Sequence, residues 1–382
     1  MRVLMFAPYP YPNVPIHGGV ESVSYNLIQG FKQLNTKIEL HVLSMMHDVD
    51  ETVNITPTIT IQYLKRLHRS RKIELIKHIK PLLIKLNQEW NPDIIHIQGN
   101  GSNFLLYHKS YKHKLVYTQH GVLSQEIKYT DSSRRKLNYL VSLLIENFNA
   151  PKVKNWIFIS RYNQTLNNKL VANGINFRCI YNPVNPIYID AIKHNIDSGN
   201  GLLFVGSITP RKGLHDLLNA LYRSNESDYH LHIVGGFSSA DYENKIRNQV
   251  MQCGLEGKIT FHGWKATEQI IEIANSCRYL VLPSHQETLP CVIAEAMAMG
   301  KVVIASLVGG TAEMVKDGET GFLYNPGNIE ELTTILHKAL HLTNLQYAAM
   351  SGKAANRANE LYLPTEVANQ TLHFYQSIIT HE

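Results

Sequence analysis

Short apolar segments that read as strands alternate with segments of helical periodicity along most of this chain. In the first half, strands are predicted at Val3–Ala7, Lys37–Leu43, Ile59–Tyr63, Ile94–Ile97, Leu115–Thr118, Trp156–Ile159 and Arg178–Tyr181. Helices are predicted between them at Val20–Leu34, Ile73–Gln88, Arg134–Asn147 and Tyr162–Leu170. Because strands separated by helices pair in parallel, this order predicts a doubly wound parallel sheet.

The same alternation resumes after a break. The polar, proline-containing stretch Tyr181–Pro186 is predicted to be a linker. Beyond it, strands are predicted at Leu202–Val205, His230–Val234, Lys258–Phe261, Tyr279–Leu282 and Val302–Ala305, and helices at Gly213–Tyr222, Asp241–Cys253, Thr267–Asn275 and Pro290–Met299. The block from Ile329 onward is purely helical. Since 382 residues are too many for one core, the pattern favours two tandem Rossmann-like domains facing each other across a cleft.

Composition is that of a globular protein, with 44% hydrophobic and 18% charged residues. The apolar N-terminal stretch VLMFA is interpreted as a first strand rather than as a secretory signal. We see no apolar run near the ~18 residues that a membrane-spanning helix needs. The 4 cysteines are scattered without a CxxC pair, which is typical of reduced thiols in a cytosolic protein.

Charge divides unevenly between the two halves. Residues 1–183 contain 23 Lys and Arg against 11 Asp and Glu, whereas the remainder contains 14 against 20. The basic half is therefore expected to meet an anionic surface or ligand. Its densest basic segment, Lys65–Lys85, also carries Ile73, Ile76, Ile79 and Leu83 at helical spacing. Such a basic amphipathic helix can lie on anionic lipid, or it can simply cover a sheet; the two interpretations stand level.

Two features at predicted strand ends mark the first half. A proline-stiffened loop leads from the first strand to Gly18 and Gly19 at the start of a helix. Paired glycines let a ligand approach the backbone, and a helix N-terminus favours an anion, although a plain turn explains them equally. His120 lies just beyond the strand Leu115–Thr118, where it is either a site residue or a structural histidine.

The loop FVGSITPRKG of the second half places Arg211 and Lys212 at the start of a helix. Cations there oppose the helix dipole. An external anion such as a diphosphate would remove this conflict, because the helix amides and both cations could bind it; two surface cations are the simpler alternative. Further glycine loops follow the next two strands at Gly235 and before Trp264. Trp264 either walls a nucleobase or packs on its own domain.

Two carboxylates lie in the strand–loop–helix–strand unit of residues 279–306. Glu287 is in the loop after the strand, where ligands of parallel sheets bind. Glu295 is inside an otherwise apolar helix and needs hydrogen-bond partners. From this pair alone, a slightly simpler interpretation is that Glu287 complements the helix dipole and Glu295 faces solvent.

The triplet Asp48-Val49-Asp50 has the form with which some sugar-nucleotide enzymes hold a divalent metal. It lies in a polar loop of the basic half, far along the chain from Arg211, and is interpreted as a solvated turn. The sequence contains no His/Cys cluster that suggests zinc. No metal is expected.

Five ordered motifs, FVGSITPRKG, IVGG, FHGW, PSHQETLPCVIAEAMAMGKVVIAS and GGTAEMVKDGETGFLYNPGN, closely resemble the retaining family 4 glycosyltransferases of the GT-B fold. The resemblance covers nearly all of residues 201–327 and reaches the first half only through Gly18-Gly19, residues 117–121 and the stretch IYNPVN. It implies an acceptor-side domain at residues 1–183, a donor domain at 184–363, and a helix at 364–382 that crosses back to the first domain.

The resemblance further implies transfer of a hexose or N-acetylhexosamine from a nucleotide diphosphate sugar with retention of anomeric configuration. UDP-sugars are the first expectation for the donor and GDP-mannose the second. A glycan or lipid-linked acceptor in bacterial-type surface polysaccharide synthesis, such as lipopolysaccharide or capsule, is the expected acceptor. No cofactor, metal or nucleic acid is expected. The expected location is the cytoplasm, with contact to the inner face of the cytoplasmic membrane as a further option.

The site implied by the resemblance has named roles. Arg211 and Lys212 would hold the diphosphate, Glu295 the ribose hydroxyls, and Glu287 the donor sugar, while His120 would contact sugar or acceptor from the opposite domain. Catalytic roles fall to Glu287, His120, Arg211 and Lys212. The full donor-binding set is Gly18, Gly19, Ser207, Arg211, Lys212, Gly235, Trp264, Glu287, Thr288, Leu289 and Glu295. Ser207 stands where many members carry arginine, which leaves the phosphate contacts open.

Two other function classes remain compatible with the residues. The first is a GT-B-like sugar-nucleotide 2-epimerase, which would need additional acid/base residues at the sugar. The second is a non-enzymatic binder of nucleotides or nucleic acid, although the basic half lacks the interleaved aromatic residues of single-strand platforms.

Overall fold

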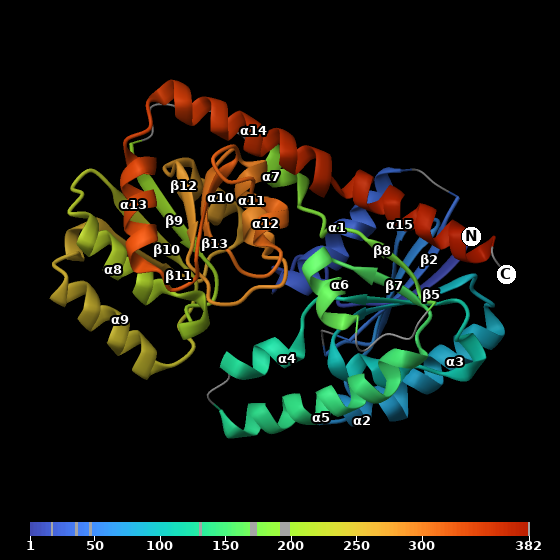
Figure 1. Cartoon of the computed structure of the whole chain (residues 1–382). Helices are drawn as coiled ribbons and strands as arrows, with labels where there is room; N and C mark the ends of the chain where they lie inside the picture. The colour runs from blue at the N-terminus through green and yellow to red at the C-terminus, as the bar shows by residue number, and fades with distance from the viewer. Residues whose placement is uncertain are drawn as a thin grey trace. The chain divides into compact units, whose positions relative to one another are not determined.

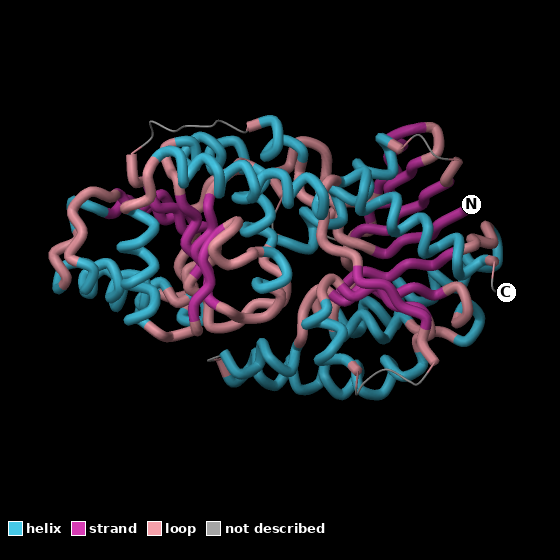
Figure 2. The backbone as a smooth tube through the Cα atoms, turned by 45° about the horizontal axis from the view of Figure 1, so that its top comes forward, coloured by secondary structure: helices cyan, strands magenta, loops and turns pink. Residues whose placement is uncertain are grey.

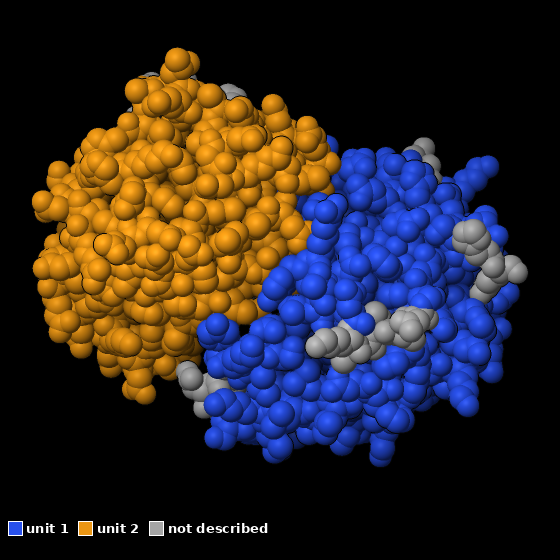
Figure 3. All heavy atoms as spheres, in the orientation of Figure 1, with its two compact units in different colours: residues 1–183, 362–382 blue, residues 184–361 orange. Residues whose placement is uncertain are grey.

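The computed structural model describes residues 1–16, 18–34, 37–45, 48–129, 132–168, 174–191 and 199–380. Its contacts divide the chain into two compact units, shown in Figure 3: unit 1, Met1–Pro183 with Tyr362–Glu382, and unit 2, Val184–Leu361. Each unit contains one sheet with helices packed on its two faces (Figures 1 and 2). The predicted pair of Rossmann-like parallel-sheet domains is confirmed.

The sheet of unit 1 has eight strands in the order β3-β4-β2-β1-β5-β6-β7-β8. Their bounds are β1 (Arg2–Phe6), β2 (Glu39–Ser44), β3 (Glu51–Thr56), β4 (Ile59–Tyr63), β5 (Ile94–Gly99), β6 (Leu115–Gln119), β7 (Asn155–Phe158) and β8 (Asn176–Cys179). All neighbouring strands are parallel except β3 and β4. Residues 3–6 of β1 and all of β5 are buried, because helices cover both faces of the sheet there.

The helices of unit 1 connect these strands. Their bounds are α1 (Gly19–Gln33), α2 (Arg71–Glu74), α3 (Lys80–Glu89), α4 (Leu123–Glu126), α5 (Ser133–Asn149), α6 (Arg161–Asn167) and α15 (Pro364–Ile379). Short turns of other helical types are η1 (Leu75–Ile79, π-helical), η2 (Gly101–Leu106), η3 (Lys109–Tyr111), η4 (Ile127–Tyr129) and η5 (Ala150–Lys152). The predicted end of the helix near Leu170 lies outside the described residues.

The single helix predicted over Ile73–Gln88 is instead α2, the π-helical turn η1 and α3 in succession. Pro81 explains the interruption, since it has no amide N–H to complete the α-helical bond to the carbonyl of Lys77. Ile79 and Leu83 are buried against the sheet, whereas Ile73 and Ile76 are 45% and 49% exposed. Most of this segment therefore covers the sheet.

The C-terminal helix α15 packs on α1 of unit 1, as predicted. A Cβ atom at Gly30 of α1 would lie 2.1 Å from the carbonyl oxygen of Pro364, so only glycine allows this approach. At the other end, the hydroxyl of Tyr375 lies 2.5 Å from Nδ1 of His96 on β5. The chain terminus thus completes the core of the first unit.

Unit 2 has a six-stranded, fully parallel sheet in the order β11-β10-β9-β12-β13-β14. Its strands are β9 (Gly201–Val205), β10 (His230–Val234), β11 (Ile259–Gly263), β12 (Tyr279–Leu282), β13 (Val302–Ser306) and β14 (Gly321–Tyr324). Its helices are α7 (Pro186–Asp190), α8 (Leu214–Ser224), α9 (Ala240–Gln252), α10 (Thr267–Asn275), α11 (Cys291–Ala298), α12 (Thr311–Met314), α13 (Ile329–Leu340) and α14 (Asn344–Tyr362), with 3-10 turns η6 (Pro210–Lys212) and η7 (Glu256–Lys258).

Two edge strands were not predicted. β3 carries polar residues and is largely exposed, so it lacks the apolar signal of a buried strand. β14 has only four residues between glycine-containing turns, and the surrounding block was predicted to become helical only after it. No helix of the described residues is both long and apolar enough to cross a membrane.

Each sheet has one point where the order of strands reverses. In unit 1 it lies between β1 and β5, and in unit 2 between β9 and β12. The connections after the two strands leave toward opposite sides there, which opens a crevice beyond their carboxyl ends. The loops after β1, β5, β9 and β12 therefore hold the positions where a ligand is expected.

Candidate active site

The loops after β9 and β12 join two cations to a buried carboxylate in unit 2. Nζ of Lys212 lies 2.6 Å from Oε1 of Glu287. A guanidinium nitrogen of Arg211 lies 3.7 Å from Oε2 of the same carboxylate and donates to the carbonyl oxygen of Gln286 at 2.7 Å. The hydroxyl of Ser284 donates to Glu287 at 2.8 Å. All of these residues come from the reversal point of the sheet.

The backbone that carries the two cations is fixed by a glycine. Gly213 has φ +66 and separates the 3-10 turn η6 from α8. A Cβ atom there would lie 1.9 Å from the carbonyl oxygen of Pro283, which follows β12. Lys212 and the loop that contains Glu287 are thereby pressed together, and the backbone amide of His285 donates to the carbonyl of Arg211 at 2.8 Å.

The other side of the Glu287 loop is fixed in the same manner. Gly309, with φ +60, follows β13 and approaches so closely that a Cβ atom would lie 2.1 Å from the carbonyl oxygen of Glu287. The amide of Gly310 donates to the carbonyl of Thr288 at 2.8 Å. The loop is held from both flanking strands, so its side chains are positioned before any ligand binds.

Glu287 is ionised in this setting. Burial alone would raise its pKa, but the Lys212 and Arg211 cations, together with hydrogen bonds from Lys212 and Ser284, outweigh burial and hold the pKa below its usual value. The two cations thus have an internal anion, which was not considered from the sequence and which a residue 75 positions along the chain supplies. Two cations still face one carboxylate, and the surplus positive charge remains for a further anion.

Glu295 lies on α11, the helix that follows this loop. Burial raises its pKa to about 7. The carboxylate accepts no hydrogen bond from the residues that the structure describes, and Tyr188 on α7 is close enough to have its own pKa raised by it. The carboxylate of Glu295 is therefore shielded from solvent. No described residue donates a hydrogen bond to it, so a bound ligand could supply the donor.

The remaining predicted donor residues of unit 2 lie at the same edge of the sheet. Ser207 is exposed just after β9, and the amide of Gly235 donates to the carbonyl of Gly263 at 2.8 Å. Trp264 follows β11 and is 54% exposed. Thr288 and Leu289 are buried in the Glu287 loop.

Unit 1 has a pocket of its own at the reversal point between β1 and β5. Its volume is about 360 Å³, and its lining comes from the ends of these strands, the start of α1, the start of α2 and η2. The lining residues are Pro8, Gly18, Gly19, Val20, Glu21, Arg71, Gln98, Gly99, Asn100 and Asn103. Gly18, with φ +94, precedes α1 and leaves its first amides open to the pocket.

His120 borders this pocket through two of its lining residues. Nε2 lies 3.0 Å from the side-chain oxygen of Gln98, and the backbone amide of His120 donates to Oδ1 of Asn100 at 2.9 Å. Burial lowers the pKa of His120 to about 4, so the imidazole is neutral at neutral pH. With Nε2 donating to Gln98, Nδ1 is a buried acceptor that has no hydrogen-bond donor among the described residues.

Several residues of these sites were not singled out from the sequence. Gln98 lies near the end of the buried strand β5 and Asn100 follows that strand directly, a signal that could have been used in the way it was for His120. Arg71 was counted only as part of a basic segment, yet it lines the pocket and donates to Asn103 at 3.3 Å. Ser284 and Gln286 have no local signal, because their roles depend on where β9 and β12 meet.

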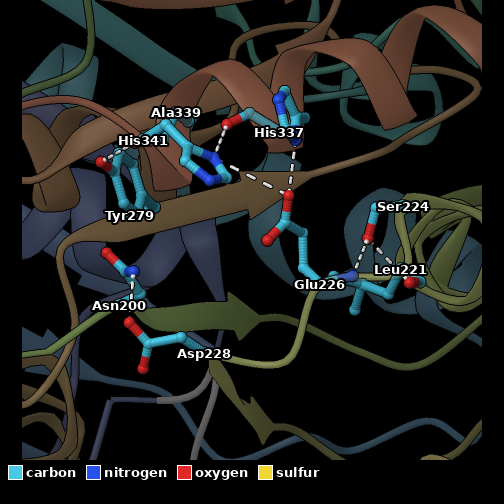
Figure 4. Close-up of polar contacts among 9 residues, drawn as sticks. All are labelled: Asn200, Leu221, Ser224, Glu226, Asp228, Tyr279, His337, Ala339 and His341. Atoms are coloured by element: carbon cyan, nitrogen blue, oxygen red, sulfur yellow. Dashed lines mark hydrogen bonds and ion pairs between the residues drawn. The ribbon is translucent and has the colours of Figure 1, made fainter.

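Two groups of side chains place three possible metal ligands within 4.8 Å of one another: His215 with Asp216 and His285, and Glu226 with His337 and His341. Figure 4 shows the second group, in which His337 lies in the last turn of α13 and His341 caps the C-terminus of that helix. Nδ1 of His337 binds Glu226 at 2.5 Å, and Nδ1 of His341 binds the carbonyl of His337 at 2.8 Å. These nitrogens are already used in hydrogen bonds.

The first group has a similar character, since Asp216 lies 3.3 Å from His215 and 3.0 Å from His285. The Asp48-Val49-Asp50 triplet lies in unit 1, where Asp48 is 3.7 Å from Lys65 and has 78% of its side chain exposed. Its interpretation as a solvated turn agrees with this placement.

Two parallel α/β units, a C-terminal helix that returns to the first, and a cationic site at the reversal point of the second sheet define a glycosyltransferase of the GT-B fold. Residues 17–187 match the model of Glycosyltransferase Family 4, and residues 189–357 match Glycosyl transferases group 1. The chain belongs to this family of glycosyltransferases.

Known proteins agree with this membership. The chain is 29% identical over 350 residues to an uncharacterized glycosyltransferase of Methanocaldococcus jannaschii, covering 90% of this chain and 89% of that protein. It is 32% identical over 149 residues to a lipopolysaccharide 1,2-N-acetylglucosaminetransferase of Salmonella typhimurium, covering 36% of this chain and 39% of that one. The HepE structure from Anabaena, solved with UDP and glucose, matches 99% of this chain and 100% of its own length, at 22% identity with a TM-score of 0.69.

Proposed function

We propose that this glycosyltransferase moves a hexose or N-acetylhexosamine from a UDP-sugar to a glycan or lipid-linked acceptor, with retention and without a metal ion. GDP-mannose is the second donor in order of expectation. The observation that carries the proposal is the cluster of Arg211, Lys212 and Glu287 at the reversal point between β9 and β12. The cluster has a surplus of positive charge at the place where a parallel sheet binds ligands.

The surplus charge suits the diphosphate of the donor. As the sugar–phosphate bond breaks, negative charge grows on the leaving phosphate oxygen, and a preorganised cation lowers the energy of that state most. Arg211 and Lys212 are held in place by Glu287 and Gln286 before the donor arrives. Little reorganisation is then needed during the reaction, and no metal is required to neutralise the phosphates.

Glu295 is proposed to bind the ribose. Ribose hydroxyls donate hydrogen bonds, and a carboxylate accepts them best when ionised. The pKa of Glu295 is about 7 in the empty protein because burial disfavours the charge. Bound hydroxyls would supply the missing donors and lower that pKa. The UDP in the HepE structure supports UDP as the nucleotide.

The proposed stereochemistry follows from the state of Glu287. This carboxylate already interacts with Lys212 and accepts from Ser284, and both interactions reduce its nucleophilicity. We therefore propose attack by the acceptor hydroxyl on the same face from which the diphosphate leaves. The acceptor oxygen forms a bond to the anomeric carbon, the bond to the phosphate oxygen breaks, and that phosphate oxygen takes the acceptor's proton. Glu287, with the amides of Thr288 and Leu289, would hold the sugar hydroxyls.

The acceptor is proposed to belong to a surface polysaccharide, because a relative acts on lipopolysaccharide. His120 of unit 1 is proposed to contact the sugar or the acceptor, and Gly18 and Gly19, which line the pocket of unit 1, are proposed to bind the donor. The location is proposed to be cytoplasmic, in agreement with the absence of a disulfide among the 4 cysteines. Membership of a glycosyltransferase family favours transfer over the 2-epimerase and the non-enzymatic binder.

A panel of UDP-, GDP-, ADP- and TDP-sugars tests the proposal. Unfolding temperature should rise most with the correct nucleotide, since a ligand that binds only the folded state stabilises it by mass action. The rise should persist with EDTA and vanish in Glu295→Ala. NMR of the product should show the anomeric configuration of the donor. If none of the four nucleotide sugars raises the unfolding temperature, the proposed donor class is refuted. A product with inverted anomeric configuration would refute the proposed retention.

A further inference from the structure

The helix α5 of unit 1 presents an apolar stripe to solvent. Its members recur at spacings of three and four residues, which places them on one face of the helix. They are Leu137, Leu140, Val141, Leu144 and Phe148, with exposures of 63%, 51%, 38%, 69% and 70%. Water-exposed apolar stripes of this size are rarely left without a partner in a soluble protein.

A shallow groove extends the stripe onto the neighbouring segment. Ile76 of η1 is 49% exposed and lines, with Lys80, Leu105 and several α5 residues, a cavity of about 520 Å³. Figure 1 shows α5 beside the segment that α2 begins. The exposed apolar surface therefore spans two chain segments and forms one continuous face.

Among the described residues of α5 and η1, the exposed charged side chains are all basic. Arg134, Arg135 and Lys136 are exposed in the first turn of α5, and Lys77 is exposed on η1. At the other end, Nζ of Lys152 lies 3.6 Å from the ring centroid of Phe148. The basic residues thus frame the apolar stripe at both ends.

The acidic residues of the same segments point the other way. Glu146, the one carboxylate of α5, is 1% exposed and accepts from Gln119 at 2.9 Å. Glu74, at the end of α2, is fully buried and accepts from the amides of Leu67 and His68. Inward acids and outward bases make the face cationic as well as apolar, and this combination is complementary to an anionic lipid surface.

We propose that the face formed by α5 and η1 docks unit 1 on an anionic membrane, with the stripe in the headgroup region and the basic residues on lipid phosphates. The proposal does not depend on the transfer reaction. It differs from the basic helix expected over Lys65–Lys85, because Ile79 and Leu83 of that segment are buried. Arg71, which begins α2, also lines the pocket of unit 1, so docking would bring that pocket beside the lipid headgroups.

Co-sedimentation of the full chain with vesicles tests this. The chain should bind vesicles of phosphatidylcholine mixed with phosphatidylglycerol, bind phosphatidylcholine alone at least about ten times more weakly, and lose binding at high salt. The double variant Leu144→Glu/Phe148→Glu should reduce binding at least about tenfold. Leu345→Glu, at a position 81% exposed on α14 of unit 2, is the matched control and should bind like the wild type.

These substitutions should leave the fold intact, because all three positions are exposed to solvent. An unchanged unfolding temperature of each variant will verify that it is folded. A triple Arg134→Ser/Arg135→Ser/Lys136→Ser variant should lose the preference for anionic lipid. Equal binding by wild type and the Leu144/Phe148 variant would overturn the proposal, as would absence of binding to anionic vesicles. Light scattering that shows a dimer in the wild type and a monomer in that variant would assign the face to a second copy of the chain instead.

Discussion

Lys212 and the buried Glu287 form an ion pair of 2.6 Å across the two loops that meet at the reversal point of the second sheet. Neither residue's partner can be found from its own neighbourhood, since the strands β9 and β12 that bring them together are far apart in sequence. The pair has two effects. It orders both loops without a ligand, and it keeps Glu287 ionised.

Replacing Lys212 by alanine should therefore reduce both stability and turnover. Loss of the nearest cation leaves a buried carboxylate with only Arg211 as countercharge, at a cost of about 3 kcal/mol in the free energy of unfolding. Turnover should fall at least about 100-fold, because the leaving phosphate loses its cation. Urea unfolding and a donor-turnover assay measure the two effects, with exposed Lys316→Ala as control. A variant with wild-type turnover would remove Lys212 from the site.

Glu295 should make donor binding depend on pH. Its pKa of about 7 in the empty protein means that, as pH falls below 7, the carboxyl becomes neutral and accepts ribose hydrogen bonds less well. The dissociation constant of the nucleotide should rise toward a limit of about tenfold per pH unit. Calorimetric titration of Glu295→Gln should give weaker binding with a flat pH profile, while exposed Glu272→Gln keeps the wild-type slope. Identical slopes in wild type and Glu295→Gln would contradict the ribose assignment.

Glu146 should make stability depend on pH. Burial raises its folded-state pKa to about 7, above the ordinary value of 4.5. Folding therefore favours the neutral form of Glu146. Its contribution to the free energy of unfolding is complete below about pH 4.5 and is lost as the pH rises through 7. Glu146→Gln removes this loss and should be more stable than the wild type at pH 8 by up to roughly 3 kcal/mol. Chemical unfolding at pH 5 and pH 8 tests it; a difference that does not grow with pH refutes it.

His120 should influence turnover without affecting nucleotide binding. Its neutral ring offers Nδ1 as an acceptor in unit 1, whereas the cationic cluster lies in unit 2. His120→Ala is expected to lower kcat about 100-fold and to leave the dissociation constant of UDP unchanged. Because its pKa is about 4, wild-type activity should show no step from this group near pH 6.5. The exposed His113→Ala is a suitable control, and a loss of UDP affinity in His120→Ala would speak against the division of roles.

Gly213→Ala should disturb the donor site through the backbone. The new Cβ atom would lie 1.9 Å from the carbonyl oxygen of Pro283, so the turn that carries Arg211 and Lys212 must move. Gly318 also has a positive φ, of +72, but open space around it, and Gly318→Ala should lose only about 1 kcal/mol from backbone strain. Comparing the thermal unfolding of the two variants separates the cost of the steric contact with Pro283 from the cost of a positive φ. Equal losses would show that the contact with Pro283 is unimportant.

The alternation of strands and helices was sufficient to predict both parallel sheets, because buried central strands such as β1 and β9 have continuous apolar runs. The same signal is weak in the exposed edge strand β3 and in the four-residue strand β14, and both were missed. Pro81 accounts for the interruption at η1 in the segment that was predicted as one helix. The predicted and observed bounds differ most at strand ends and turns, because few buried residues mark these positions in the sequence.

The candidate site was predictable to the extent that its residues follow strands. Arg211, Glu287 and His120 all stand in such loops, and the structure places the first two within 4 Å of each other. Their pairing was not predicted, since a sequence does not show which loops are neighbours in space. Gln98 and Arg71 were overlooked for the same reason. Their importance depends on a pocket that several separate segments of the chain enclose.

The helix α15 has a consequence for synthesis of the chain. Its residues Pro364–Ile379 pack on α1, and Tyr375 closes over His96 in the core of unit 1. Unit 1 is therefore encoded at both ends of the chain, and its core stays open on the ribosome until the last helix has emerged. Unit 2 is continuous, and all of its residues leave the ribosome earlier. The domain that is translated first is the one that finishes folding last.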